Sequence, residues 1–423
     1  MGVRGVASQF YFAAGEDSAT VHAFLTLLNS DSRPTRVRLT FYGHTGVAIT
    51  RGMTVGATRE RTLSVADLHV GSGPFGLAVR ADRAIAATLT LSRVGRDGDI
   101  LLGSPDLATH WYLAEGYTSL TFHESVAILN PGAVPAHVTL HLLPVDGRGA
   151  RSIRLRVAAH SAAIADVNRF LPHRSLSVST DSDQPVVVAR TVTFSSDRVG
   201  PGFGLTLRTG STTPATSWLF AEGSTLDRVQ TFLTVLNPGR ARARVTAQFY
   251  GSSGRALGRR TLIVAAQSRG TLKLNTFLKA NDIASVVTSD RPVLIERAEY
   301  FGAPNSPYIA GSDVFGRNGA ATRWSFPGGP GLGMSESILL YNPSAVAVAI
   351  EVTFYGRDGE TRRFHFTMPP HARYGLSVRR GLANFASERG VTLRATNGHG
   401  FVAEQTLFTP DHRSLLSTQG FAQ

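Results

Sequence analysis

The chain contains no cysteine, and this absence excludes several kinds of site. Without cysteine there are no disulfide bonds, no thiolate ligands for a metal and no cysteine nucleophile. Long apolar runs are missing as well, since stretches such as 185–189 fall far short of the roughly 18 residues that a membrane-spanning helix needs. The sequence therefore predicts a folded chain that does not insert into a membrane.

Lysine is almost absent, so the net charge of +13 comes from 41 arginines and only two lysines. Such a charge can indicate affinity for nucleic acid, anionic lipid or acidic polysaccharide. Nucleic-acid-binding proteins usually gather their basic residues on one stripe or tail. Here pairs such as Arg36/Arg38 and Arg242/Arg244 occur along the whole chain. This scatter favours arginines on solvent-exposed faces and makes nucleic acid an unexpected partner, whereas acidic polysaccharide stays open.

What the sequence does contain is a repeat. The motif Trp-Tyr-Leu-Ala-Glu-Gly at 111–116 returns as Trp-Leu-Phe-Ala-Glu-Gly at 218–223, with weaker copies at 10–15 and 324–329. The spacings between first residues are 101, 107 and 106. A fixed period near 100 residues indicates an array of one structural unit. The predicted units are 1–110, 111–217, 218–323 and 324–423.

Each predicted unit reads as a series of short strands. An apolar run ends in Asn and is followed by a segment that alternates strictly, as Val138, Leu140 and Leu142 do with Thr139 and His141. Alternation with a period of two indicates a half-buried antiparallel strand. About seven such segments per unit, separated by turn residues, predict an all-β fold of four tandem immunoglobulin-like β-sandwich repeats. The Asn that ends the apolar run is interpreted as a turn former; its four copies are Asn29, Asn130, Asn237 and Asn342.

Links rich in glycine and serine connect the predicted units. They share a Gly-Ser pair at 103–104, 210–211 and 311–312, and they also contain apolar residues such as Leu101 and Leu207. Apolar residues favour ordered links that pack on a sheet edge or into the junction with the next unit. The array is therefore predicted to be semi-rigid.

These features resemble a known type of repeat. The Trp-Tyr-x-Ala-Glu-Gly motif, the strand that ends in Asn-Pro-Gly and the ending Glu296-Arg297-x-x-Tyr300-Phe301 are similar to a β-sandwich repeat of large exported proteins in Actinobacteria and Chloroflexota. Such repeats belong to families described only as domains of unknown function. The resemblance implies an exported, cell-surface setting and offers no catalytic residues.

Comparing the copies of the motif suggests an ion pair. Glu115 and Glu222 occur in the two units whose last strand carries Arg190 and Arg297, respectively. In the first and fourth units both positions lose their charge together, as expected for a partly buried pair, because loss of one partner leaves an uncompensated charge. We therefore expect Glu115–Arg190 and Glu222–Arg297 to pair within their units.

The aromatic residue that opens the motif is the other candidate structural site. Tryptophan opens every unit but the first. Exposed aromatics can bind sugars, but recurrence at the unit boundary favours packing there. The residues concerned are Trp111, Trp218 and Trp324.

No catalytic, cofactor or metal motif stands out. His137 and His141 lie about 13 Å apart on one face of a strand, too far to share a zinc ion. The literal Gly-x-Gly-x-x-Gly at 71–76 contains Pro74 and leads into a strand, whereas a dinucleotide site needs it to open a helix. Asp181-Ser182-Asp183 lacks the further ligands of a calcium loop and reads as a hairpin turn. The chain is therefore predicted not to be an enzyme and to need no cofactor.

The resulting expectation is an extracellular or cell-surface structural or adhesive protein, such as a stalk, a surface-layer element or a filament subunit. Its expected partners are copies of itself, docking end to end through 3–8, or other surface proteins. The alternative is a carbohydrate-binding array for acidic cell-wall glycans. The first eight residues show no signal-peptide core. A leader is then missing from this chain, export uses another route, or the protein stays inside.

Overall fold

The computed structural model describes residues 5–46, 48–93, 97–145, 147–196, 200–226, 228–279, 281–302, 308–328, 334–356, 359–378, 389–409 and 414–423. Over these residues the chain is all-β, with two single-turn 3-10 helices, Ala66–Leu68 (η1) and Leu274–Thr276 (η2), and no α-helix. Segments 1–110, 111–217, 218–323 and 324–423 are called repeats 1 to 4 below. The first strands of repeats 2 to 4 begin up to three residues before these bounds.

The strands of repeats 1 and 2 follow one pattern. Those of repeat 1 are Ala7–Asp17 (β1), Val21–Asn29 (β2), Thr35–Tyr42 (β3), Ala48–Val55 (β4), Arg59–Ser64 (β5), Gly73–Arg93 (β6) and Gly98–Leu102 (β7). Those of repeat 2 are Ala108–Leu113 (β8), Tyr117–Thr118 (β9), Phe122–Asn130 (β10), Ala136–Pro144 (β11), Arg151–Val157 (β12), Ser161–Asp166 (β13), Arg174–Ser196 (β14) and Gly200–Thr209 (β15).

Repeat 3 continues the pattern, whereas the strands of repeat 4 are divided between two sheets. Repeat 3 contains Ala215–Phe220 (β16), Val229–Asn237 (β17), Ala243–Tyr250 (β18), Ala256–Val264 (β19), Ser268–Lys273 (β20), Ala284–Phe301 (β21) and Ala310–Phe315 (β22). Repeat 4 contains Arg323–Phe326 (β23), Ser335–Tyr341 (β24), Val348–Gly356 (β25), Thr361–Met368 (β26), Arg373–Ser377 (β27), Arg389–Ala395 (β28), Val402–Phe408 (β29), Leu415–Gln419 (β30) and Phe421–Ala422 (β31).

One antiparallel strand order recurs in the first three repeats: β4-β3-β6-β2-β5, β12-β11-β14-β10-β13 and β19-β18-β21-β17-β20. The long central strand serves two sheets. In β14, residues 176–182 pair with β11 and residues 187–194 pair with β10. In repeat 4 this strand is divided into β28 and β29, which belong to separate sheets. The alternating segment behaves as predicted, since Val138, Leu140 and Leu142 are buried while His137 is exposed.

The asparagine that ends the second strand of each repeat holds two loops together. In repeat 2 the Asn130 side chain is fully buried, and its amide donates to the carbonyls of Val134 (2.8 Å), Val157 (3.3 Å) and Ala158 (3.0 Å). Its oxygen accepts from the Gly132 N–H at 3.0 Å. The corresponding bonds recur in the other repeats, so the turn-forming interpretation is confirmed and extended.

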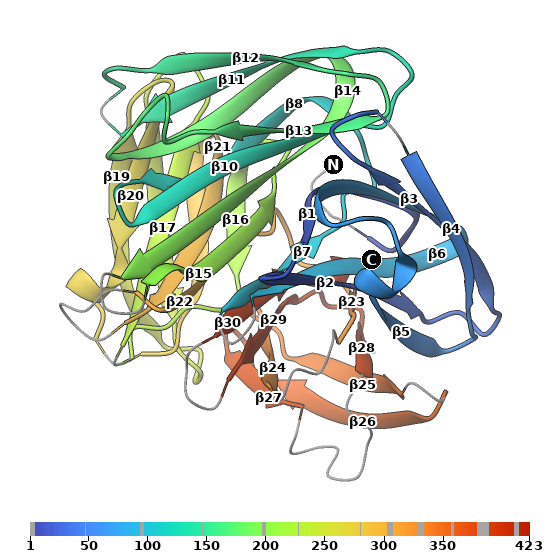
Figure 1. Ribbon diagram of the computed structural model, residues 1–423. Coiled ribbons are helices and arrows are strands. Elements are labelled where there is room, and N and C mark those ends of the chain that lie inside the picture. Colours follow the sequence, from blue (N-terminus) through green and yellow to red (C-terminus); the bar gives the residue numbers. More distant parts are fainter. Residues whose placement is uncertain are drawn as a thin grey trace.

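The four repeats form a ring around the strands that follow each long strand (Figure 1). Each of β7, β15, β22 and β30 pairs with the strand before it, and they pack side by side in the cyclic order β7, β15, β22, β30 and back to β7. Repeat 4 (orange to red) therefore packs on repeat 1 (blue), with β5 against β25 and β28. β20 of repeat 3 lies in the same way against β11 and β14 of repeat 2. The expected semi-rigid array is thus a closed one.

Two details add to the expectations. Ala7, in segment 3–8, pairs with Ile85 in the sheet of repeat 1, and the Phe10 ring lies 5.4 Å from the Phe421 ring of repeat 4. Positions 1–4 lie outside the described residues. In repeat 3 the equivalent of Gly103-Ser104 is Gly316-Arg317 and not Gly311-Ser312, because Arg317 pairs with the first strand as Ser104 does.

Candidate functional site

A fully buried carboxylate at the centre of the ring touches all three other repeats. Asp97, directly before β7, accepts the N–H of Leu205 (3.3 Å) in β15 and of Gly311 (3.1 Å) in β22. It also accepts the N–H of Leu415 (3.0 Å) and the hydroxyl of Ser414 (2.9 Å) at β30. Burial raises the pKa of Asp97 to about 8, although these four hydrogen bonds oppose the rise. One side chain thereby ties the four central strands together.

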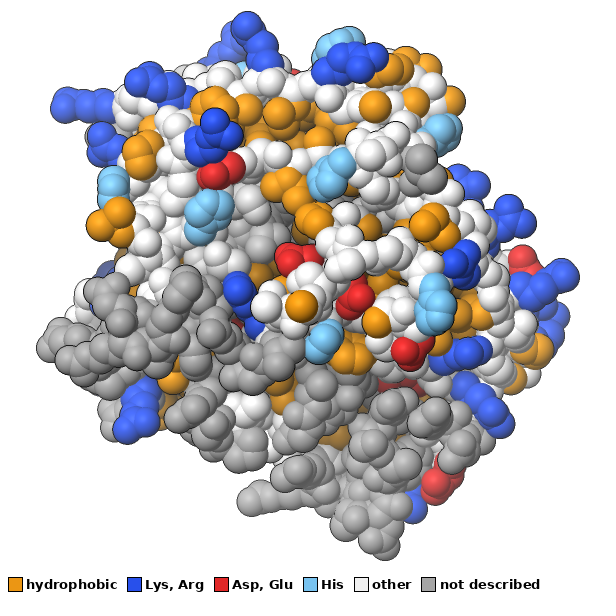
Figure 2. All heavy atoms as spheres, viewed as in Figure 1, with side chains coloured by type: hydrophobic (Ala, Val, Ile, Leu, Met, Phe, Trp, Pro, Cys, Tyr) orange, Lys and Arg blue, Asp and Glu red, His pale blue; other side chains and the backbone are white. Residues whose placement is uncertain are grey.

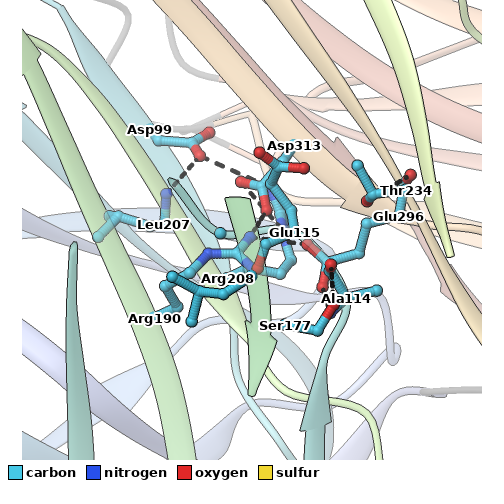
Figure 3. Close-up of polar contacts among 12 residues, drawn as sticks. Asp99, Ala114, Glu115, Ser177, Arg190, Leu207, Arg208, Thr234, Glu296 and Asp313 are labelled. Carbon is cyan, nitrogen blue, oxygen red and sulfur yellow. Dashed lines mark hydrogen bonds and ion pairs between the residues drawn. The ribbon is translucent and has the colours of Figure 1, made fainter. Parts of the chain in front are cut away.

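A second set of buried polar residues lies on the strands β7, β15 and β22 (Figure 3). Asp99 of β7 accepts the Leu207 N–H at 2.8 Å and lies 3.6 Å from the Arg208 guanidinium of β15. Arg208 also lies 3.8 Å from Asp313 of β22. Burial holds the pKa of Asp99 well above its ordinary value. Burial acts on Asp313 too, but Arg190 and Arg208 outweigh it and lower the pKa of that carboxyl.

Arg190 does not pair with the carboxylate expected for it. Its guanidinium donates to the backbone carbonyl of Glu115, and its charge pairs with Glu296 (2.7 Å) and Asp313, both of repeat 3. All of these groups are almost completely buried. Burial raises the pKa of Glu296 to about 8, while Arg190 acts in the opposite direction. The expected Glu115–Arg190 pair within repeat 2 is therefore corrected to a pairing between repeats.

The carboxylate of Glu115 also reaches into the next repeat. Arg269 on β20 of repeat 3 donates to it at 2.7 Å and to the Leu176 carbonyl at 2.7 Å. The contact between repeats 3 and 4 has the same design. Glu222 pairs with Arg373 at 2.5 Å, and Arg297 pairs with Glu404 at 2.6 Å. The expected Glu222–Arg297 pair is likewise corrected: each member binds a residue of repeat 4.

We name each contact between neighbouring repeats a joint, numbered by the two repeats. Four positions form the centre of every joint, and the strand registers define which residues match. Joint 2–3 carries Glu115, Arg190, Arg269 and Glu296; joint 3–4 carries Glu222, Arg297, Arg373 and Glu404; joint 1–2 carries Ala14, Leu89, Ala162 and Ala189; joint 4–1 carries Gly328, Gln405, Glu60 and Thr88. At joint 4–1 the Gly328 N–H donates to Glu60 at 2.7 Å.

This comparison explains why the charges disappear together. Joints 2–3 and 3–4 are charged at all four positions and joint 1–2 is apolar at all four, because a single buried charge without a partner is costly. Joint 4–1 differs, since Glu60 is its one charged residue among the four and binds the Gly328 N–H. Comparison of the four copies found half of each set and missed Arg269, Glu296, Arg373 and Glu404. These four residues are visible in the sequence, but each lies in the repeat that follows its partner, whereas the comparison looked for partners within one repeat.

The tryptophans are buried, as a packing role requires, at most 2% exposed and on the first strand of their repeats. The hydrogen bonds of their indoles lie within their own repeats and not across the unit boundary. The indole N–H of Trp111 donates to the Val186 carbonyl at 3.0 Å, and that of Trp218 to the Val293 carbonyl at 3.1 Å. Trp324 makes the matching bond to the Phe401 carbonyl at 3.0 Å. They fasten the first strand to the middle of the long strand or its equivalent, and none is available as a sugar platform.

The remaining polar candidates are separate from one another. His141 and His137 bind different carboxylates, Asp181 (2.8 Å) and Asp183 (2.8 Å) respectively. Among the described residues no group of three or more His, Asp and Glu side chains is placed to hold a metal ion. No described helix has the length and apolar character needed to cross a membrane. On the face in Figure 2, Lys and Arg side chains lie at separate places around the rim and form no single stripe.

Comparison with models of protein families identifies the family of this chain. Residues 5–200 and 195–293 match the model of a family of unknown function, DUF5719. The chain belongs to this family. The DUF5719 matches span repeats 1 and 2 and most of repeat 3. A search of curated proteins found no match.

Solved structures give only distant likenesses to this DUF5719 protein. Thermotoga maritima 1070 is 18% identical over 24% of this chain and 92% of its own, with a TM-score of 0.23. The Anabaena sensory rhodopsin transducer is 24% identical over 20% and 87%, with a TM-score of 0.19. A tetra-tandem repeat from the extending region of a large adhesion protein is 11% identical over 97% and 98%, with a TM-score of 0.12. At these TM-scores the likenesses carry no argument.

Proposed function

We propose that this DUF5719 chain is a non-catalytic structural or adhesive protein of the cell surface, in which four immunoglobulin-like repeats form one block. The observation that carries the proposal is the use of the buried acids and bases. The carboxylates and guanidiniums in the interior bind each other and the backbone across the joints and the central strands. Groups held in this way connect neighbouring repeats to one another.

The positions of the sheet edges indicate which surfaces of the block are free to contact a partner. Strands β5 and β20 are covered at joints, whereas β12, β19 and β26 are outer edges. Those outer edges carry exposed arginines, including Arg154, Arg156, Arg259 and Arg260. Positive charge on an edge strand opposes pairing with another chain. Assembly by addition of strands at these edges is therefore disfavoured, and end-to-end docking stays a prediction for other surfaces.

Two measurements test the proposal. Electron microscopy of the purified protein should show a four-lobed ring, and protease treatment of intact source cells should degrade the protein while cytoplasmic markers survive. Complete protection in intact cells with degradation after lysis would contradict the surface location. Extended, separated lobes would contradict the single block.

The same exposed arginines favour a second function, binding of acidic cell-wall glycans. Guanidinium groups bind carboxylates through paired hydrogen bonds, and the attraction weakens with salt. We expect the protein to bind polygalacturonate but not dextran, with affinity that falls as sodium chloride rises. Replacing Arg151, Arg154 and Arg156 of β12 by Gln should weaken binding without altering the ring. Equal binding of dextran and polygalacturonate would count against this function.

A further inference from the structure

Joint 3–4 contains a pocket that is much larger than the matched space at joint 1–2. Its volume is about 490 Å³, within the range of about 300–1,000 Å³ that is usual for small-molecule sites. The apolar walls include Leu339, Phe301, Phe408 and Leu415. At joint 1–2 the matched space holds only about 90 Å³, and Ile164 lies there at the position of Gly375.

At joint 2–3 the matched space is filled by aromatic rings. The Phe122 ring lies 5.1 Å from Tyr117, 5.2 Å from Phe194 and 5.9 Å from Tyr300. The Phe232 ring lies 6.2 Å from Tyr300. Such separations are typical of aromatic packing. The matched space at joint 2–3 therefore accommodates aromatic rings.

Joint 3–4 has lost three of these rings. The strand registers match Tyr117 to Ser224, Phe122 to Val229 and Phe232 to Ser337. All three smaller residues line the pocket. The retained walls still supply apolar and aromatic surface. The pocket is thus open where its counterpart holds Tyr117, Phe122 and Phe232, which indicates a ligand with one or two rings.

The pocket also has a carboxylate that its counterpart does not have. Asp282 occupies the position of Ser175, and its side chain is 48% exposed. Its interaction with Arg373 is long, at 3.7 Å, because that guanidinium is held by Glu222 at 2.5 Å. The lining includes three carboxylates, with Glu299 the third, and two guanidiniums, with Arg228 the second. Glu222 is paired with Arg373, and Glu299 lies 3.4 Å from Arg297, so the half-exposed carboxylate of Asp282 is the one that favours a ligand with a positive charge.

We propose that the pocket at joint 3–4 binds a small aromatic amine, with its rings between Phe301, Phe408 and Leu339 and its amine at Asp282. The proposal does not depend on the cell-surface function, since it rests on the pocket alone.

Three indole compounds test the assignment by isothermal titration calorimetry. Tryptamine, tryptophol and indole-3-propionate share a ring system and differ in the head group. We expect tryptamine to bind tightest, tryptophol more weakly and indole-3-propionate weakest. Water partly screens the hydrogen bond between the ammonium group and the half-exposed Asp282, so Asp282→Asn should weaken tryptamine binding about tenfold and leave tryptophol binding unchanged. Tightest binding by indole-3-propionate would overturn the amine assignment.

Variants copied from joint 2–3 supply the matched controls. Val229→Phe with Ser337→Phe restores two of the missing rings and should abolish binding, while urea unfolding shows whether the variant remains folded. Phe122→Val with Phe232→Ser should open a second pocket at joint 2–3. That pocket has Ser175 where joint 3–4 has Asp282, so it should bind tryptophol and tryptamine equally. Tryptamine binding that survives in the filled variant, or no indole binding by the wild-type protein, would refute the pocket as a ligand site.

Discussion

Removal of Arg190 tests whether the joints depend on charge compensation. This side chain is fully buried and pairs with Glu296 and Asp313. Arg190→Leu leaves these two carboxyl groups of repeat 3 beside each other at joint 2–3, with Arg208 still 3.8 Å from Asp313. Loss of one partner of a buried pair costs about 3–5 kcal/mol. We expect the free energy of unfolding at pH 7 to fall by that amount in urea titrations followed by tryptophan fluorescence.

The loss of unfolding free energy in Arg190→Leu should increase as the pH rises, because the variant changes the ionisation of Glu296. In the wild-type protein its pKa is raised to about 8, so it ionises beside Arg190 above that pH. Without the guanidinium its pKa rises further, and the folded variant retains a proton that the folded wild type has lost. Each pH unit above 8 should then destabilise the variant by about a further 1.4 kcal/mol relative to wild type.

Joint 1–2 supplies the control for this experiment. Its residues at the positions of Arg190, Glu296 and Asp313 are Leu89, Ala189 and Leu207. The triple variant Arg190→Leu, Glu296→Ala, Asp313→Leu copies them and should recover more than half of the loss, since no carboxyl group of this set remains unpaired. A triple variant as unstable as Arg190→Leu alone, or a loss below about 1 kcal/mol for the single variant, would refute the reasoning.

Three further outcomes follow from the same contacts. Because Asp97 and Glu296 have folded pKa values raised to about 8, the folded state binds more protons than the unfolded chain between about pH 4.5 and 8. Stability should therefore fall as the pH rises through that window, and Asp97→Asn should flatten this urea-unfolding profile. Gly316→Ala places a Cβ 2.7 Å from the Phe220 ring and should cost about 1–3 kcal/mol of unfolding free energy by calorimetry. Gly319→Ala is the neutral control, because a Cβ added there meets no atom within 4 Å. Asn130→Ala leaves the buried Val157 carbonyl without its amide and should cost about 1–3 kcal/mol, so unchanged hydrogen exchange at the β12–β13 turn would contradict its role.

The period and the strands could be predicted because both are local properties. Alternation in β11 and the Asn at the end of β10 depend on neighbours in the chain, and these elements form where the pattern indicates. Ring closure could not be predicted in this way, since it depends on how β5 meets β25 and β28 across the whole chain. A period of about 100 residues is equally compatible with an open rod.

The candidate site was predicted in part, and the error is instructive. The positions of Glu115 and Arg190 lose their charges together in repeats 1 and 4, and this correctly indicated buried charges that depend on each other. Sequence comparison alone could not say whether the partner lies in the same repeat or the next one. The structure shows that Glu115 binds Arg269, which belongs to the following repeat. A search for partners shifted by one repeat would have found this arginine together with Arg373.

The different chemistry of the joints bears on how the ring assembles in the correct order. Tandem repeats with similar sequences misassemble when one repeat docks on the wrong neighbour. If repeat 4 docked on repeat 1 in place of repeat 2, Arg373 would meet Ala14 where it now meets Glu222. A buried guanidinium without a carboxylate costs about 3–5 kcal/mol, whereas replacement of a whole buried pair by apolar residues is often neutral. We infer that the charged joints contribute more to the order of the repeats than to stability. The apolar joint 1–2 excludes the charged surfaces of repeats 3 and 4 for the same reason.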